Sequence, residues 1–394
     1  MTASLDRFAR EKLAALEGRS ARRRLRPGVA DARSFVPEGG ERPLLAFASN
    51  DYLGLAGHPA LLAAAEGALR AGGASARASR LVVGTSPECR ALEAELADLK
   101  GTEAACVFGS GYHVNLGVIP ALVGPEDGIY VDALAHACLF SGARLSRARV
   151  EVFPHDDVGA LADRLSATRA SVRHAMVLTE GVFSMDGDAA SLAGIAAACR
   201  AHDAWLLVDD AHATGVMGPR GAGSAAAAGL DPEDVPLQVG TLSKALGGYG
   251  GYLAASEAVI DLMITRARTL IYSTGLPPAT VAAARAALRV VETEPDRRRR
   301  PVAHARRVAA ALGLPRPAAA VLPVPVPGGD NETALTAQVH LRERGLWVPA
   351  MRPPTVPEGT ARLRLSFSAA HTDEDVDRLL EGFGALGWSH GGGR

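Results

Sequence analysis

The sequence contains little lysine and few aromatic residues. Of its 42 basic residues only Lys12, Lys100 and Lys244 are lysine, and aromatic residues make up 5% of the 394 residues. Arginine stays protonated in proteins, so it cannot serve as an amine nucleophile. A reaction that needs an amine side chain therefore has three candidate residues in this chain.

Cysteine, net charge and long apolar runs are also scarce. The four cysteines form no C-x-x-C pair and have no zinc-like spacing, so we expect neither a disulfide framework nor a metal site. A net charge of -1 gives no reason to expect a nucleic-acid or membrane partner. Residues 1–7 lack the apolar core of a secretory signal, which favours a cytoplasmic location. Residues 104–125 carry no Asp, Glu, Lys or Arg, but glycine and polar residues interrupt them, so they predict a buried strand followed by a helix.

From about residue 100, short apolar runs alternate with alanine-rich stretches. Near-continuous apolar strands separated by helices are typical of a parallel sheet that is covered on both faces. We therefore expect an α/β fold with a mostly parallel seven-stranded sheet flanked by helices. The predicted strands are residues 104–108, 129–131, 150–153, 175–179, 205–208, 237–239 and 251–254.

The pattern changes on both sides of this region. Residues 1–47 are expected to form an N-terminal helix and a basic arm, and residues 48–285 a large cofactor-binding domain. Residues 286–394 are expected to form a smaller α+β domain, with a strand at 362–367 and a helix at 373–383.

Lys244 lies in the string GTLSKALGG at residues 240–248, directly after a predicted buried strand. A desolvated pocket lowers the pKa of an ammonium group, and the neutral amine can form a Schiff base with an aldehyde. Lys100 is expected at the C-terminal end of a helix and Lys12 in the amphipathic N-terminal helix. Lys244 is thus the candidate nucleophile, and the alternative is a surface lysine in a loop.

The string WLLVDDAH at residues 205–212 places two carboxylates and an imidazole after a buried strand. Strand ends of this kind face the ligand crevice in doubly wound sheets, so Asp209 and His212 would enter it together. A carboxylate there can keep a pyridinium nitrogen protonated, which makes the ring of pyridoxal phosphate (PLP) an electron sink. The alternative is a metal site at Asp209, Asp210 and His212, but further ligands at suitable spacing are lacking.

Three further strand ends carry polar or glycine-rich strings. FGSGY at residues 108–112 joins a strand to a helix, where backbone N–H groups suit a phosphate. Thr241 offers a hydroxyl to the same phosphate. His136 follows another strand and is either a structural residue or a ring that stacks on a cofactor, and Ser184 follows a third.

Together these strings resemble the PLP-dependent α-oxoamine synthases of the fold-type I aminotransferase superfamily. The resemblance covers residues 47–371 and implies a homodimer with shared active sites, which transfers an acyl group to carbon with loss of CO2. Its most specific strings are residues 179–188, 209–215, 240–244, 271–274 and 352–364.

The resemblance also implies roles for individual residues. Lys244 would form the Schiff base with the cofactor, Asp209 would pair with the pyridine nitrogen, and His136 would stack on the ring. These three and His212 are the expected catalytic residues. The other expected cofactor contacts are His212 and Ser184 to the ring oxygen, Gly111, Tyr112 and Thr241 to the phosphate, and Ser273 and Thr274 to the phosphate of the neighbouring subunit.

The same resemblance implies the substrates. Arg364, assisted by Asn50, would bind the amino acid carboxylate through a two-pronged pair. Arg26, Arg352 and Thr355 are expected on the acyl-thioester side, although the basic run at residues 22–26 could also be a solvated helix end. The strings at 47–55 and 352–357 look most like family members that condense L-alanine with a pimeloyl thioester of CoA or an acyl carrier protein.

Several alternatives stay open. Within the family they are glycine with acetyl-CoA or succinyl-CoA, and serine with a long-chain acyl-CoA. A nicotinamide oxidoreductase is disfavoured because the chain has no G-x-G-x-x-G string in the required context. A regulatory protein without activity is disfavoured because Lys244, Asp209, His136 and His212 are all retained.

Overall fold

The computed structural model describes residues 2–18, 21–40 and 42–388. Residues 1, 19, 20, 41 and 389–394 belong to the expected N-terminal and C-terminal domains and lie outside the described residues. Within the described ranges, none of the helices is both long and apolar enough to cross a membrane.

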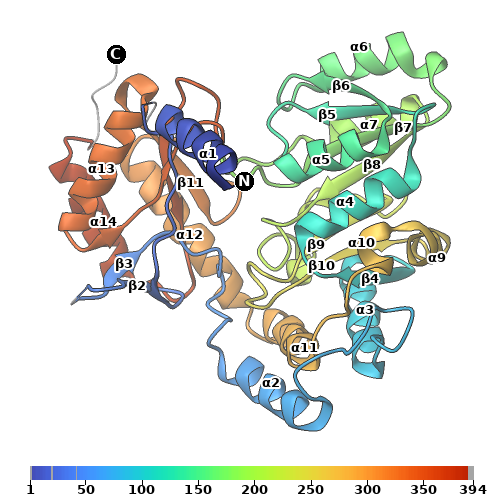
Figure 1. The fold of residues 1–394 in the computed structure, drawn as a ribbon, viewed down its shortest axis with the longest axis horizontal. Helices are drawn as coiled ribbons and strands as arrows, with labels where there is room; N and C mark the ends of the chain where they lie inside the picture. Colours follow the sequence, from blue (N-terminus) through green and yellow to red (C-terminus); the bar gives the residue numbers. More distant parts are fainter. Residues whose placement is uncertain (1, 19–20, 41, 389–394) are drawn as a thin grey trace.

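A seven-stranded sheet with the order β4-β10-β9-β8-β7-β5-β6 forms the larger part of the molecule (Figure 1). Only β10 runs antiparallel to its neighbours, and the other adjacent strands of this sheet are parallel. The strands are β4 (Ala104–Phe108), β5 (Gly128–Asp132), β6 (Arg149–Phe153), β7 (Ala175–Glu180), β8 (Ala204–Asp209), β9 (Leu237–Thr241) and β10 (Gly251–Ala255). All seven predicted strands and the mostly parallel α/β fold are therefore confirmed.

Helices cover both faces of this sheet. Successive strand residues point to opposite faces, so an apolar strand has apolar side chains to bury on each face. Met176 and Leu178 of β7 lie in one buried cluster, whereas Val177 lies in another. The first face carries α4 (Gly111–Leu122), α5 (Ala137–Ser146), α9 (Glu257–Arg266) and α10 (Arg268–Ile271). The second carries α3 (Pro87–Lys100), α6 (Val158–Thr168), α7 (Leu192–Ala201) and α8 (Ser224–Ala227); α11 (Pro278–Thr293) packs against α3, and α2 (Pro59–Gly72) packs against α11.

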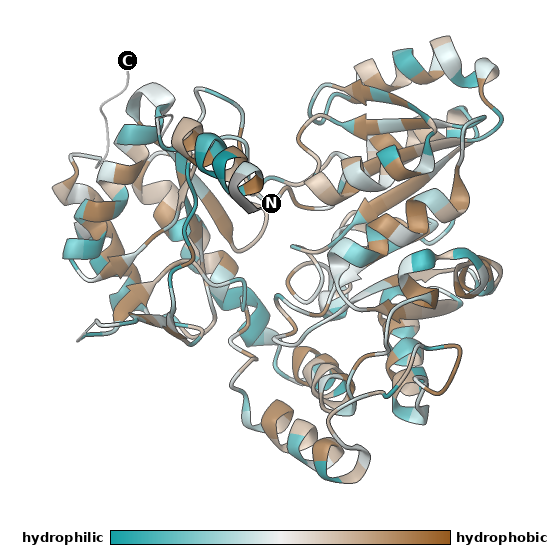
Figure 2. Cartoon of the chain, in the orientation of Figure 1, coloured by the Kyte–Doolittle hydropathy of each residue, from teal (hydrophilic) through white to brown (hydrophobic). Residues whose placement is uncertain are grey.

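The edge strand β6 differs from the buried strands that the sequence suggests. Val150 is 38% exposed and Val152 is 45% exposed, because β6 pairs only with β5. In Figure 2 the inner strands are coloured mostly as hydrophobic, whereas α1 (Thr2–Glu17) carries both hydrophilic and hydrophobic residues.

The smaller part combines both ends of the chain. One sheet has the order β1-β2-β3-β12, and a second has the order β11-β14-β13. The parallel pairing of β3 with β12 joins the N-terminal segment to the C-terminal region, so residues 1–47 do not stand alone. The elements are β1 (Gly28–Ala30), β2 (Ser34–Pro37), β3 (Leu44–Ala46), β11 (Val321–Pro325), β12 (Leu346–Trp347), β13 (Ala350–Met351), β14 (Arg362–Ser366), α12 (Pro295–Ala311), α13 (Asn331–Glu343) and α14 (Asp373–Ala385).

The chain passes from the larger to the smaller part through α11 and α12. The proposed limit at residue 285 lies inside α11, which packs against α2 and α3. The expected strand at 362–367 and helix at 373–383 correspond to β14 and α14.

Candidate active site at the carboxyl ends of the strands

The carboxyl ends of β4, β5, β7, β8 and β9 lie at one edge of the seven-stranded sheet. Asp209 is the last residue of β8, and Thr241 is the last residue of β9. Gly111, His136 and Ser184 follow β4, β5 and β7. This edge therefore collects most of the residues that the sequence predicts for the cofactor.

Lys244 and His212 are in direct contact. Nζ of Lys244 lies 2.7 Å from Nε2 of His212; His212 is buried and Lys244 is partly buried. Burial lowers the pKa of Lys244 to about 8, although Asp209 and Glu180 oppose this shift. Burial and the Lys244 charge hold the pKa of His212 well below its usual range. The imidazole is thus neutral and can accept a hydrogen bond from Lys244.

A chain of hydrogen bonds orients His212. Its Nδ1 lies 2.6 Å from the hydroxyl of Tyr52, which donates to Oδ1 of Asn50 at 3.1 Å. If Lys244 donates to Nε2, then Nδ1–H donates to the Tyr52 oxygen, and every donor has an acceptor. Nη1 of Arg364 also donates to Oδ1 of Asn50 at 3.4 Å. The structure therefore links Lys244, His212, Asn50 and Arg364, which the sequence places far apart.

Asp209 is held by a hydrogen bond from helix α4. Nδ2 of Asn115, on α4, donates to Oδ2 of Asp209 at 2.7 Å, and N–H of Ala211 donates to Oδ1 at 3.0 Å. Glu180 is the register partner of Asp209 on β7 and is also buried. Burial, and then the charge of Asp209, raise the pKa of Glu180 well above its usual range. The neutral form of Glu180 is thus favoured beside the Asp209 carboxylate.

Two buried polar atoms beside Asp209 have no hydrogen-bond partner among the described residues: Oδ1 of Asn115 and Oε1 of Glu180. Buried polar groups in native proteins are almost always hydrogen-bonded, so an orphaned pair indicates a place for a polar ligand.

The start of α4 forms a narrow cradle. A Cβ on Gly111 would lie 3.3 Å from Cβ of Thr241, and a Cβ on Gly251 would collide with the backbone of Gly111. The N–H groups of the first helical turn have no acceptor within the helix, so those of Gly111 and Tyr112 are suited to an anion. The Thr241 hydroxyl donates to O of Gly250 at 2.8 Å and lies beside Gly111. The Lys244 amine thus fits the aldehyde of PLP, and the Asp209 carboxylate fits its pyridine nitrogen. The start of α4 fits its phosphate.

His136 has a structural contact as well as a place near the site. Its Nδ1 accepts a hydrogen bond from N–H of Cys138 at 3.3 Å and so caps α5. Burial lowers the pKa of His136, although Asp209 opposes this shift. A structural role as the cap of α5 is therefore compatible with the predicted role of stacking on a cofactor ring.

Arg364 comes from the smaller part of the molecule. It lies on β14, is buried, and donates from Nε to O of Ser184 at 2.6 Å. Nη1 also donates to Oγ of Ser366 at 2.9 Å. These contacts fix the guanidinium beside Asn50, next to the Lys244 network.

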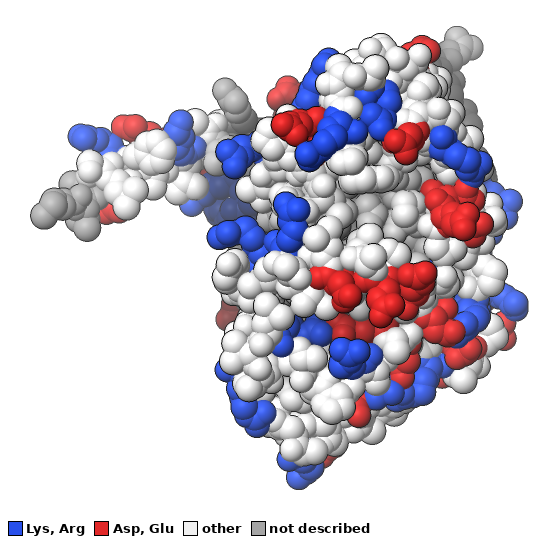
Figure 3. Space-filling view, turned by 90° about the vertical axis from the view of Figure 1, so that its right-hand side faces the viewer, with Lys and Arg blue, Asp and Glu red and all other residues white. Residues whose placement is uncertain are grey.

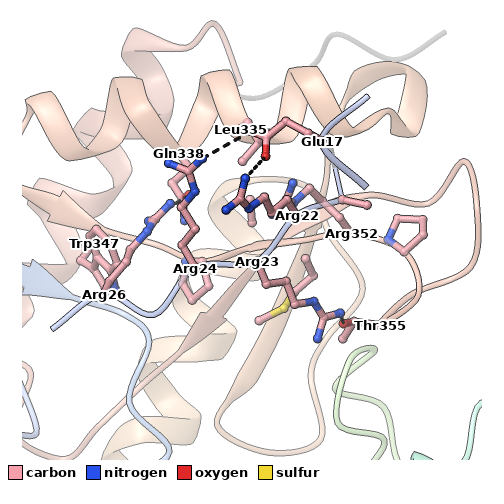
Figure 4. A pocket seen from close by; sticks show the side chains of 15 residues that line it. Glu17, Arg22, Arg23, Arg24, Arg26, Leu335, Gln338, Trp347, Arg352 and Thr355 are labelled. Carbon is pink, nitrogen blue, oxygen red and sulfur yellow. Dashed lines mark hydrogen bonds and ion pairs between the residues drawn. The ribbon is translucent and has the colours of Figure 1, made fainter. Parts of the chain in front are cut away.

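A second hollow, of about 570 Å³, contains the three residues expected for the acyl thioester (Figure 4). Arg26 stacks over Trp347 at 5.2 Å and donates to Oε1 of Gln338 at 3.5 Å. Nη2 of Arg23 donates to Oγ1 of Thr355 at 2.6 Å. The charged residues that line this hollow are Glu17, Arg22, Arg23, Arg24, Arg26 and Arg352. The run at 22–26 thus lines a cavity and is not only a solvated helix end.

Some predicted residues lie apart from Lys244. Ser273 and Thr274 follow α10 and line a small hollow with Arg80 and Phe108, and Thr274 forms a β-bridge with Ser79. Tyr112 is 46% exposed, and its hydroxyl donates to Oγ of Ser141 at 3.3 Å. Its side chain is therefore not part of the buried cluster.

Sequence reasoning assigned no role to Tyr52, Asn115 and Glu180. Glu180 ends β7 as Asp209 ends β8, so the same rule about strand ends could have found it. Asn115 lies one turn after Gly111 on α4. Tyr52 had no comparable signal, because its contact with His212 spans 160 residues.

Comparisons with known proteins agree with this geometry. Residues 42–383 match the family model described as aminotransferase class I and II. The chain belongs to this family, and it is a PLP-dependent transferase with the fold-type I architecture.

Individual relatives are named more specifically. The chain is 53% identical over 387 residues to the 8-amino-7-oxononanoate synthase of Methylobacterium nodulans, covering 98% of both chains. It is 57% identical over 342 residues to the 8-amino-7-oxononanoate synthase of Methylocella silvestris, covering 87% of this chain and 96% of the relative. A solved structure of serine palmitoyltransferase from S. paucimobilis, with bound PLP and myriocin, is 30% identical, covers 98% of both chains and superposes with a TM-score of 0.88.

Proposed function

We propose that the protein is an 8-amino-7-oxononanoate synthase of biotin biosynthesis. It condenses L-alanine with a pimeloyl thioester of CoA or an acyl carrier protein, and it releases CO2 and the free thiol. The observation that carries the proposal is the contact of the partly buried Lys244 with a buried, neutral His212, in a chain 53% identical to a synthase of this name.

The residues at the sheet edge are assigned to the cofactor. Asp209 would keep the pyridine nitrogen protonated, His136 would stack on the ring, and Ser184 and His212 would hydrogen-bond its oxygen. Gly111 and Tyr112 at the start of α4, with Thr241 at the end of β9, would hold the phosphate. When bound, PLP withdraws electrons from the amino acid, which weakens the bonds from Cα to hydrogen and to the carboxylate.

The protein moves the proton through Lys244. With a pKa of about 8, a substantial fraction of its amine is neutral near pH 7.5 and can accept the Cα proton of alanine. His212 Nε2 then accepts a hydrogen bond from the resulting ammonium, and the Tyr52 hydroxyl keeps the ring in place. Arg364 and Asn50 bind the alanine carboxylate. Burial of His212, Arg364 and Tyr52 limits the access of water, a competing source of protons, to this site.

The basic hollow is assigned to the acyl donor. A pimeloyl thioester carries a terminal carboxylate, and its carrier contributes phosphates, so the donor is anionic at both ends. Arg26, Arg352 and Thr355 lie together in a hollow of about 570 Å³, a volume typical of small-molecule sites. Arginine forms strong charge-assisted hydrogen bonds with such groups.

A homodimer is proposed for the assembly. Leu81, Val82, Val83 and Tyr272 are large apolar residues with more than half of their surface exposed, and contiguous exposed apolar residues indicate a contact surface. The β-bridge between Ser79 and Thr274 places this segment beside Ser273 and Thr274, the residues assigned to the neighbouring subunit's phosphate.

The N-terminal helix supports the same assembly. The described side chains of α1 are all exposed, including Leu5 and Phe8. Figure 3 shows an arm projecting from the body, with Lys and Arg residues gathered where the arm meets it. A second copy of the chain would cover its apolar residues.

The four cysteines are free and buried, which supports the proposed cytoplasmic location.

A substrate panel tests the reaction. Purified holoenzyme is assayed for thiol release with alanine, glycine and serine, each against pimeloyl-, acetyl-, succinyl- and palmitoyl-CoA and against a pimeloyl carrier protein. We expect the highest kcat/KM with alanine and a pimeloyl thioester. The likeness to serine palmitoyltransferase makes serine with palmitoyl-CoA the second candidate, and a higher kcat/KM for that pair would replace the first proposal.

A further inference from the structure

The Lys100 ammonium is fully buried and points into the protein, although the residue ends a helix. Nζ donates to Oδ2 of Asp210 at 2.7 Å and to O of Ala222 at 2.5 Å, and its side chain has no exposed surface. Burial, the largest single influence, would lower the pKa of Lys100, but the charges and hydrogen bonds of Asp210 and Tyr252 together outweigh it and raise the pKa. Lys100 is therefore a cation paired inside the molecule.

Asp210 lies next to Asp209 but faces the other side of the sheet. Asp209 contacts Asn115 on α4, and Asp210 contacts Lys100 on α3. The clusters that contain α3 and α4 lie on opposite faces. The ion pair thus sits directly behind the carboxylate assigned to the cofactor.

Asp210 also anchors the turn that carries His212. Its N–H donates to O of Val239 at 2.7 Å, and its carbonyl accepts from N–H of Ala213 at 3.0 Å and of Thr214 at 2.9 Å. Its carboxylate accepts from N–H of Ser224 at 3.1 Å and from the Ser224 hydroxyl. Asp210, which lies between Asp209 and His212, is thus held through its main chain by β9 and the following turn, and through its side chain by Lys100 and Ser224.

The surroundings leave no space for another arrangement. Gly223 has a φ of +107° and a side chain there would collide with the Asp210 carboxylate; a side chain at Gly181 would do the same. A buried ion pair commonly stabilises a fold no more than an apolar pair of the same size, whereas removal of one partner leaves a costly buried charge. Stability alone does not explain a buried pair at this place.

We propose that Lys100 and Asp210 are positioning residues, whose ion pair fixes Asp209 and His212 from behind the sheet for their work on the cofactor. Lys100 also balances the charge of the Asp210 carboxylate inside the molecule. This inference rests on the proposed cofactor site but not on the choice of amino acid or thioester.

The double variant Lys100→Met, Asp210→Asn tests the proposal without leaving a buried charge. The amide that Asp210→Asn introduces would keep an acceptor for Ser224, so we expect the variant to fold with a Tm close to that of the wild type. We expect about tenfold weaker PLP binding by the apoprotein, about tenfold lower kcat and an unchanged thioester KM, because misplaced groups lose transition-state contacts first. The pH midpoint of the visible absorbance of bound PLP should shift as well.

Arg285→Met is the matched control. Arg285 on α11 pairs with Glu88 and Glu95 of α3, the helix that also carries Lys100, but it does not touch β8. This variant should leave PLP binding, kcat and the pH midpoint at wild-type values. A folded double variant that behaves in the same way would overturn the proposal.

Ser224→Ala covers the case in which the double variant fails to fold. It removes a hydrogen bond to Asp210 and keeps both charges, so we expect a smaller loss of kcat in the same direction with a shifted pH midpoint. Wild-type values for both quantities would overturn the proposal. A wild-type protein that does not bind PLP would instead contradict the proposed function, before any variant is compared.

Discussion

Nζ of Lys244 and Nε2 of His212 lie 2.7 Å apart in a pocket that lowers the pKa of both groups. Two cations at this distance would repel each other, so one of them must give up its proton. His212 has the lower pKa and is neutral first, which leaves Lys244 as the group that titrates near physiological pH.

The reaction of the apoprotein with PLP should therefore depend on pH through Lys244. Only the neutral amine attacks the aldehyde, so the initial rate should fall about tenfold for each pH unit below about 8 and level off above it. Stopped-flow absorbance after mixing apoprotein and PLP between pH 6 and 9.5 measures this rate, with Lys244→Ala as the blank. A rate that still rises about tenfold per pH unit up to pH 9.5, as expected for a lysine with the ordinary pKa of 10.5, would contradict the assignment.

Tyr52→Phe should lower both stability and turnover. The change removes the hydroxyl 2.6 Å from Nδ1 of His212 and leaves a buried N–H without an acceptor, which costs about 1–3 kcal/mol of unfolding free energy. Because the imidazole loses its orientation, kcat should fall while KM for the thioester stays constant.

Tyr130→Phe provides the control for this prediction. The Tyr130 hydroxyl lies 2.6 Å from Oγ1 of Thr168, away from Lys244. Urea unfolding should show a comparable loss of stability, and steady-state kinetics should show an unchanged kcat. Equal losses of kcat in both variants would argue against a role for Tyr52 in orienting His212.

His155→Gln should change how stability depends on pH. His155 lies between Asp132 at 3.1 Å and Asp188 at 2.9 Å, and these carboxylates raise its pKa to about 10. The folded pKa is above the unfolded value, so the contribution to stability is complete below pH 6.5 and is lost between pH 6.5 and about 10. The urea midpoint of the wild type should fall more steeply across this range than that of His155→Gln.

His174→Gln is the comparison for His155. The imidazole of His174 stacks on Trp205 at a centroid distance of 4.9 Å, and no ion pair is recorded for it in the described part of the chain. Its removal should leave the wild-type slope of stability against pH. If both variants flattened the pH dependence of the urea midpoint equally, His155 would not be the source of the wild-type slope.

Arg26→Ala should weaken binding of the acyl donor. Loss of one charge-assisted contact predicts about a tenfold higher KM for the pimeloyl thioester, with little change in kcat or in KM for alanine. Arg70→Ala is the control, because Arg70 on α2 is exposed, pairs with Glu66 and does not line the hollow. An unchanged thioester KM in Arg26→Ala would reject its assignment.

The fold was largely predictable because buried parallel strands are continuous apolar runs. All seven strands of the large sheet followed from this rule, but the exposure of β6 did not, since a run of Val and Phe does not show whether a strand lies at an edge. The short strands β1, β2 and β12 have two to four residues and too little pattern to detect.

The site was predictable where it follows from strand ends, and less so where it depends on distant contacts. Lys100 was expected at a helix end, and Gly101 does close α3 in the left-handed conformation. The direction of its ammonium was not predictable, because Asp210 is 110 residues away. The contact of Asn50 with Arg364 spans 314 residues and was available only through resemblance to a family.

The division of the molecule has a consequence for how its relatives can diverge. Lys244 and His212 follow the inner strands β9 and β8 of the large sheet, whereas the basic hollow is lined by Glu17, by residues 21–24 and 26, and by residues between 335 and 355. Mutations in the hollow can change the accepted acyl chain while the proton-transfer groups stay in place. Selection could thus produce enzymes for new thioesters without rebuilding the chemistry of carbon–carbon bond formation.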